Sequence, residues 1–141
     1  MSDIIFSNED MQYINMASNV TKTYIIDCLS SNDRIIFIVQ KGQLGAAIGI
    51  KAKNLEKLRS LFKKSIKFIE FDEDKEKFIY NLFKPYKISS VSLESNGNET
   101  VAKVEVDIGD KSKIIGKDGR NIEIIRQLAR RHHLIKDVQI R

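Results

Sequence analysis

Apolar residues in the first half of the chain change their spacing in a regular order. Met11, Ile14 and Ala17 recur at the spacing of a helix face, and Ser7 precedes them as a capping residue. The continuous apolar run 35–39 instead indicates a buried strand. The pattern predicts, in order, a helix after Ser7, strands over 23–28 and 34–40, a short helix around 46–48, a longer helix from about Asn54 and a strand over 66–71.

The second half repeats this order of elements. A helix carries apolar residues along one face, and Pro85 ends it because proline cannot continue a helix. Residues 94–98 contain an Asn-Gly dipeptide, which is typical of a tight hairpin turn. The pattern predicts a helix before Pro85, a strand over 88–93, a turn over 94–98, a returning strand to about Val106, a short helix ending at 114–115, a helix from Arg120 and a strand over 135–140.

The two halves are also related residue by residue. When the sequence is shifted by 67 positions, eight of the 23 residues from 39 to 61 meet an identical residue. The identities pair Val39, Gly42, Ile48, Gly49, Asn54, Glu56, Arg59 and Leu61 with Val106, Gly109, Ile115, Gly116, Asn121, Glu123, Arg126 and Leu128. The sequence therefore predicts a duplicated small domain, with one copy over 1–71 and the other over 72–141.

Positive charge is concentrated in the same two places. Residues 41–70 carry eight bases and two acids, and residues 109–141 carry nine bases and four acids. The rest of the chain is net acidic, although the whole chain has a net charge of +5. Segregated positive charge favours a polyanionic partner such as nucleic acid. Charge alone leaves open a second interpretation, in which both windows are only lysine-rich helix faces exposed to water.

A glycine-rich break interrupts the second basic window. Gly116 and Gly119 flank two residues between two helices, which lets the backbone turn tightly with no Cβ atoms in the way. The following helix directs its partly positive N-terminus at the same place, so a phosphate group would be stabilised there. Basic residues surround the turn, namely Lys111, Lys113, Lys117 and Arg120. A simple helical linker is the alternative interpretation, and a P-loop is excluded because the Gly-Lys-Ser/Thr ending is missing.

The segment 114–122, Ile-Ile-Gly-Lys-Asp-Gly-Arg-Asn-Ile, resembles the signature of the KH family nearly residue for residue. The resemblance implies an α+β chain of two tandem type II KH domains, each a three-stranded sheet with helices packed on one face. It also implies that the loop clamps the backbone of about four single-stranded nucleotides. The implied RNA-binding residues are Lys111, Lys113, Ile115, Gly116, Lys117, Asp118, Gly119 and Arg120 in the second domain, and Gly49, Ile50, Lys51 and Lys53 in the first.

Two type II KH domains joined directly are similar to the archaeal NusA-like transcription factors. This resemblance implies a non-catalytic factor in transcription elongation and termination, with single-stranded RNA and RNA polymerase as partners and no cofactor. A ribosome- or rRNA-associated KH protein is the alternative, since ribosomal proteins also carry type II KH domains. We further expect a monomer.

The chain departs from these families in two respects. Ala52 replaces the second glycine of the first loop, and alanine is disfavoured at positive φ. We therefore expect a different backbone path in the segment Gly49–Ala52 and a dominant second loop. Bacterial NusA proteins also have an N-terminal polymerase-binding domain and an OB-fold domain, and the sequence predicts neither in these 141 residues.

The remaining chemistry-bearing residues predict no catalytic or metal site. The single cysteine, Cys28, cannot form an internal disulfide and is expected in the core. The pair His132-His133 is expected to be exposed near a helix end, with contact to the RNA backbone as the alternative. One cysteine and two adjacent histidines do not supply the four spaced ligands of a zinc site.

The other acidic and aromatic residues favour structural roles. The run Asp72–Asp74 is expected to be an exposed acidic linker. Three phenylalanines on helical stripes are expected in the core, which disfavours base stacking on an aromatic surface; they are Phe62, Phe78 and Phe83. An acid at position 3 and the lack of a long apolar segment predict a cytoplasmic protein with no membrane partner.

Overall fold

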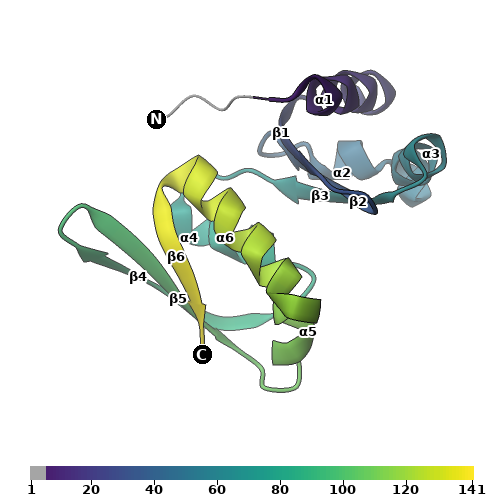
Figure 1. Cartoon of the computed structure of the whole chain (residues 1–141). Helices are drawn as coiled ribbons and strands as arrows, with labels where there is room; N and C mark the ends of the chain where they lie inside the picture. The colour runs from purple at the N-terminus through teal and green to yellow at the C-terminus, as the bar shows by residue number, and fades with distance from the viewer. Residues whose placement is uncertain (1–5) are drawn as a thin grey trace. The chain divides into compact units, whose positions relative to one another are not determined.

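The computed structural model describes residues 6–141; residues 1–5, at the start of the predicted first domain, lie outside the described residues. The described chain divides between Asp72 and Glu73 into two compact units, called here the first and second modules (Figure 1). The first module contains α1 (Asn8–Thr21), β1 (Ile25–Ser30), β2 (Arg34–Val39), α2 (Leu44–Ile48), α3 (Lys53–Phe62) and β3 (Ser65–Glu70). The second contains α4 (Lys75–Phe83), β4 (Ile88–Asn96), β5 (Glu99–Val106), α5 (Lys111–Ile115), α6 (Arg120–His133) and β6 (Ile135–Ile140).

Each module is built on a three-stranded mixed sheet. The strand orders are β1-β2-β3 and β4-β5-β6, and in each sheet the first two strands pair antiparallel and the last two parallel. A parallel pair needs a crossover connection, and a short and a long helix supply it in both modules. These mixed sheets confirm the predicted α+β class and the predicted order helix, strand, strand, helix, helix, strand.

Apolar side chains fill the space between the first sheet and its helices. Phe37 and Phe68 stack from neighbouring strands with ring centroids 5.6 Å apart, and both are buried. Ala17 of α1 and Leu58 of α3 belong to the same cluster, as does the buried Cys28, whose core position is confirmed. This packing holds α2 and α3 against the sheet and therefore fixes the turn between them.

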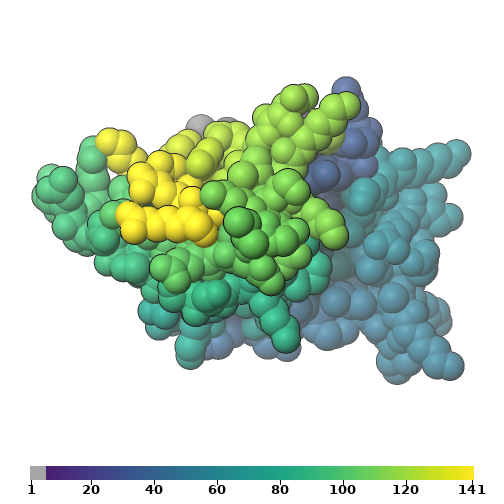
Figure 2. Space-filling view, turned by 90° about the horizontal axis from the view of Figure 1, so that it is seen from below, coloured from purple at the N-terminus to yellow at the C-terminus, as the bar shows by residue number. Residues whose placement is uncertain are grey.

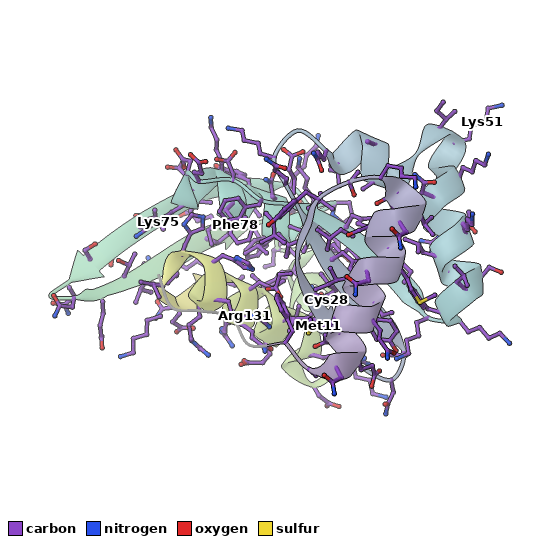
Figure 3. All side chains as sticks on the ribbon, turned by 90° about the horizontal axis from the view of Figure 1, so that it is seen from above. Met11, Cys28, Lys51, Lys75, Phe78 and Arg131 are labelled. Atoms are coloured by element: carbon purple, nitrogen blue, oxygen red, sulfur yellow. The ribbon has the colours of Figure 1, made fainter. Side chains whose placement is uncertain are left out.

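The second module packs α4 beside α6. Asp74 caps α4 by accepting a hydrogen bond from the Lys77 N–H at 3.1 Å. Phe78 is fully buried (Figure 3), and its ring centroid lies 5.7 Å from that of His132 near the end of α6. Phe78, in the middle of α4, therefore packs against the end of α6. The core positions of Phe78 and Phe83 are confirmed, and Phe62 is half-buried against Tyr13.

The first strand starts two residues later than predicted. The predicted strand 23–28 is observed as Ile25–Ser30. The hydroxyl of Thr21 donates to the carbonyl of Ala17 at 2.7 Å and lies 2.6 Å from the hydroxyl of Thr23. These contacts satisfy the polar groups at the helix end, so Thr23 and Tyr24 form the connection to β1.

The hairpin turn is shorter than predicted. Asn96 pairs with Glu99, so the turn consists of Gly97 and Asn98 alone, and Gly97 takes the positive φ of 68° that a tight hairpin requires. An ion pair between Lys103 and Glu94, at 2.8 Å, lies across the extended ladder. The hairpin projects at one end of the second module, on the left in Figures 1 and 2.

Two expectations of exposure are wrong. Asp72 is buried, with a carboxylate oxygen 3.5 Å from the Lys41 ammonium group, and Asp74 is the cap of α4, so only Glu73 of the expected linker is a simple exposed acid. His132 is buried against Phe78 and is not exposed at the helix end. Both side chains are covered by residues distant in sequence, which local patterns do not reveal.

Candidate nucleic-acid interface

The turn between α5 and α6 depends on Gly116 for both conformation and space. Gly116 has φ 80° and ψ 171°, and the 3-10 turn Lys117–Gly119 leads from it directly into α6. A Cβ atom on Gly116 would lie 2.9 Å from the Cβ atom of Asn121, closer than real side chains approach. Gly119 has φ 72°, but a Cβ atom there would meet nothing within 4 Å. Gly119 is therefore favoured by conformation alone.

Asn121, in the first turn of α6, holds the turn at Gly116 together. Its side-chain amide donates a hydrogen bond to the carbonyl of Ile114 at 2.7 Å, and so connects the first turn of α6 to the last turn of α5. In the first module, Asn54 donates in the same way to the carbonyl of Ala46 at 3.0 Å. Sequence reasoning did not select these asparagines as site residues, although their identity in the repeat was the signal that could have found them.

The expected difference in backbone path of the first loop is wrong. Lys51 and Ala52 have φ of 52° and 60°, and the equivalent residues of the second loop, Asp118 and Gly119, have φ of 56° and 72°. Both turns are closed by a main-chain hydrogen bond of 3.1 Å, from Ala52 to Gly49 and from Gly119 to Gly116. Alanine at positive φ costs roughly 1–2 kcal/mol, which the surrounding hydrogen bonds offset.

The two turns carry different charges at equivalent positions. The repeat aligns exposed Ile50 with Lys117 and exposed Lys51 with Asp118. Residues 49–53 contain two lysines and no acid, whereas residues 116–120 contain two bases and one acid. The first turn is thus the more positive of the two, and Lys51 points away from the body of its module (Figure 3).

The predicted site residues of each module lie within one short stretch of chain, around the turn between its two later helices. Most of these side chains are exposed, whereas Ile115 and the glycines are half-buried. Ile50 is 86% exposed, which is unusual for a large apolar side chain. The exposed residues are Lys111, Lys113, Lys117, Asp118 and Arg120 in the second module, and Ile50, Lys51 and Lys53 in the first.

Both long helices begin at these turns. The residues that precede α3 and α6 are Ala52 and Gly119, and neither has a side chain that can cap the first helical turn. Amide groups at an uncapped helix start carry a partial positive charge. Each turn therefore combines a tight backbone, a helix N-terminus and exposed bases, an arrangement that stabilises phosphate groups.

Two other features are absent from the described part of the chain. Among residues 6–141, no group of histidine, cysteine and acidic side chains could hold a metal ion. No helix in that range is both long enough and apolar enough to cross a membrane.

Two protein families match parts of the chain. A family described as the NusA-like second KH domain matches residues 75–139, and the KH domain family matches residues 12–96. A solved structure, the crystal structure of APE1850, is 29% identical, aligns with a TM-score of 0.78 and covers 96% of this chain and 100% of its own.

Several archaeal proteins are similar over nearly the full chain, and each is named a probable transcription termination protein NusA. The protein of Halobacterium salinarum strain R1 is 35% identical over 137 residues, which are 97% of this chain and 98% of that protein. The protein of Methanocaldococcus jannaschii is 28% identical over 140 residues, which are 99% of this chain and 76% of that protein. The chain therefore belongs to the archaeal NusA-like family of transcription termination proteins, non-enzymatic factors built from KH domains.

Proposed function

We propose that the chain holds nascent single-stranded RNA across two KH domains, residues 1–71 and 72–141, while RNA polymerase elongates or terminates. The observation that carries the proposal is the shared backbone path of the two turns after Gly49 and Gly116. Each turn begins with a glycine, which has no side chain, and leads into a helix N-terminus. A sugar–phosphate backbone can approach such a surface closely.

Both turns clamp RNA in this proposal. The first turn keeps the conformation of the second in spite of Ala52, and it has two lysines without an acid. Lys51 and Lys53 therefore contact phosphate in the first module, as Lys117 and Arg120 do in the second. One KH loop clamps about four nucleotides, so two loops engage roughly eight.

A single strand is the expected ligand because the two clamps act on a flexible backbone. Phosphate contacts give a strong dependence on salt, since each neutralised phosphate releases counterions. Titration of the full chain with single-stranded RNA and duplex DNA at several salt concentrations tests this. Equal affinity for the two nucleic acids, or an affinity independent of salt, would refute the proposal.

A loop variant provides the residue-level test. Ile50→Asp with Lys117→Asp places an acid at the same position of both turns, and RNA affinity should fall at least about ten-fold for each clamp lost. Lys77→Asp is the control matched in charge to Lys117→Asp alone, since each changes the net charge by two units. Lys77 is exposed and adjoins Phe78, which packs against the end of α6 that is remote from the turn. If the control lowers affinity as much as the loop variant, only net charge matters.

We also propose that the chain associates with RNA polymerase, which rests on the family, and that it is a monomer. Co-purification of the chain with RNA polymerase supports a transcription factor, and co-purification with ribosomes instead would favour the ribosome-associated alternative. Sedimentation of the free chain tests the monomer.

A further inference from the structure

The connection between the first helix and the first strand of each module combines tyrosine and lysine side chains. In the second module it forms part of a pocket of about 590 Å³, a volume in the range of small-ligand sites. The pocket wall is mostly apolar and contains no acid. It is lined by Tyr80, Lys84, Pro85, Tyr86, Lys87 and Ile88.

The first module has an aromatic and basic side chain at the same place. Tyr24 lies between α1 and β1 with 64% of its surface exposed, although an aromatic ring is normally covered in a folded domain. Lys22, two residues earlier, is exposed at the end of α1. Strand pairing confirms the equivalence of the two connections, because each first strand shows a register shift directly after its first paired residue, Ile25 or Ile88.

Hydrogen bonds place the first connection beside the start of α2. The Tyr24 N–H donates to the Gln43 side chain at 2.6 Å, and the Gln40 N–H donates to the Tyr24 carbonyl at 3.0 Å. Gln43 is the residue that precedes α2, and α2 is only five residues long before Gly49 follows. Five helical residues span about 7.5 Å, which is the distance along α2 from the Tyr24 contact to the turn at Gly49. An RNA strand held at that turn therefore reaches Tyr24 within a few nucleotides.

The second connection has the same relation to its clamp. Ile88 pairs with Val106, and five residues later the chain enters α5, the helix that ends at the Gly116 turn. Five residues span at most about 18 Å. The pocket therefore also lies within a short strand of RNA from the clamp of its own module.

We propose that these connections are a second RNA contact in each module, where tyrosine rings stack bases beyond the clamped nucleotides and lysines contact the adjacent phosphates. Bases stack on tyrosine irrespective of sequence, and lysines beside the ring favour a nucleotide over a neutral ligand. Both connections place a tyrosine beside lysines: Tyr24 is exposed, and Tyr86 is half-buried in the wall of the pocket. The inference rests on the proposed clamping of RNA and extends it to longer strands.

The test compares two lengths of RNA on the full chain. One RNA has about four nucleotides, the length that one loop clamps, and the other is roughly three times longer. Tyr24→Ala with Tyr86→Ala should weaken binding of the longer RNA by roughly ten-fold for each ring and leave the short RNA nearly unchanged. The variants Tyr24→Phe and Tyr86→Phe retain a ring and should bind both RNAs like the parent chain.

The outcomes separate this inference from the proposed function. If the parent chain binds neither RNA, the clamp itself is refuted. If the alanine variant binds the longer RNA as well as the parent chain does, the stacking contact is refuted. The stacking contact is also refuted if the alanine variant loses affinity equally for both RNAs, or if it keeps its RNA affinity and only co-purifies less polymerase. Because Tyr86 is half-buried, Lys87→Glu serves as a second variant that removes the phosphate contact with little risk to folding.

The chain contains no tryptophan and four tyrosines, so tyrosine fluorescence reports directly on stacking. Quenching should accompany binding of the longer RNA and be weaker with the short one. Quenching that persists in the Tyr24→Ala, Tyr86→Ala variant would come from Tyr13 or Tyr80 and would count against stacking at these two rings.

Discussion

The side-chain amide of Asn121 donates to the main-chain carbonyl of Ile114 at 2.7 Å, across the turn that begins at Gly116. The same side chain occupies the space that a Cβ atom on Gly116 would need. The turn is therefore held by one polar contact and one steric requirement that belong to a single asparagine. The first module repeats both features with Asn54 and Gly49.

Asn121→Ala should lower RNA affinity several-fold and the free energy of unfolding by about 1 kcal/mol, because one partly buried hydrogen bond is lost and the turn loosens. Asn54→Ala should act in the same direction. Affinity titrations and urea denaturation measure the two effects. Asn19→Ala, on the exposed face of α1, is the control. A fully retained affinity in both loop variants would show that the asparagines only stabilise the helices.

Gly116→Ala and Gly119→Ala should differ although both glycines have positive φ. The first change adds a Cβ atom 2.9 Å from Asn121 and should cost about 2–3 kcal/mol of stability and at least ten-fold in RNA affinity. The second adds a Cβ atom in open space and should cost about 1 kcal/mol, with affinity nearly retained, because Ala52 already occupies the equivalent position. Thermal denaturation and titration check the pair, and equal losses would contradict this account.

Charge at the third position of each turn should set the relative strength of the two clamps. Asp118→Lys gives the second turn the residue of the first and should increase both the RNA affinity and its salt dependence. Lys51→Asp makes the reverse exchange and should decrease both. Titrations over a salt series decide the outcome. An unchanged salt slope in both variants would mean that these side chains do not contact phosphate.

Asp72, Glu73 and Asp74 should respond differently to alanine. Asp72→Ala removes a buried carboxylate paired with Lys41 and should cost about 2 kcal/mol. Asp74→Ala removes the cap of α4 and should cost about 1 kcal/mol. Glu73→Ala should be neutral because the side chain is exposed. Chemical denaturation measures all three, and three equal effects would restore the view of this segment as an exposed linker.

Local patterns in the sequence determined the order of elements, the duplication and the position of both turns. The spacing of apolar residues indicates a helix or a strand over a few residues of chain. Proline and glycine likewise act locally, so all of these signals can be recognised without the fold. The repeat then identified the turns as one motif in two copies. The strand boundary at Thr23 and the extent of the hairpin were not predicted, because individual hydrogen bonds decide them and the spacing of apolar residues does not reveal those bonds.

Only the tertiary structure decided the backbone conformation of Ala52 and which side chains are buried or exposed. Ala52 adopts positive φ because hydrogen bonds from Ala52 to Gly49 and from Asn54 to Ala46 hold the turn against its local preference. Asp72 and His132 are buried by partners distant in sequence, and Tyr24 stays exposed because it lies in a connection whose main-chain groups are bonded to the next loop. Contacts of this kind depend on how the chain folds back on itself, which the spacing of residues along it does not encode.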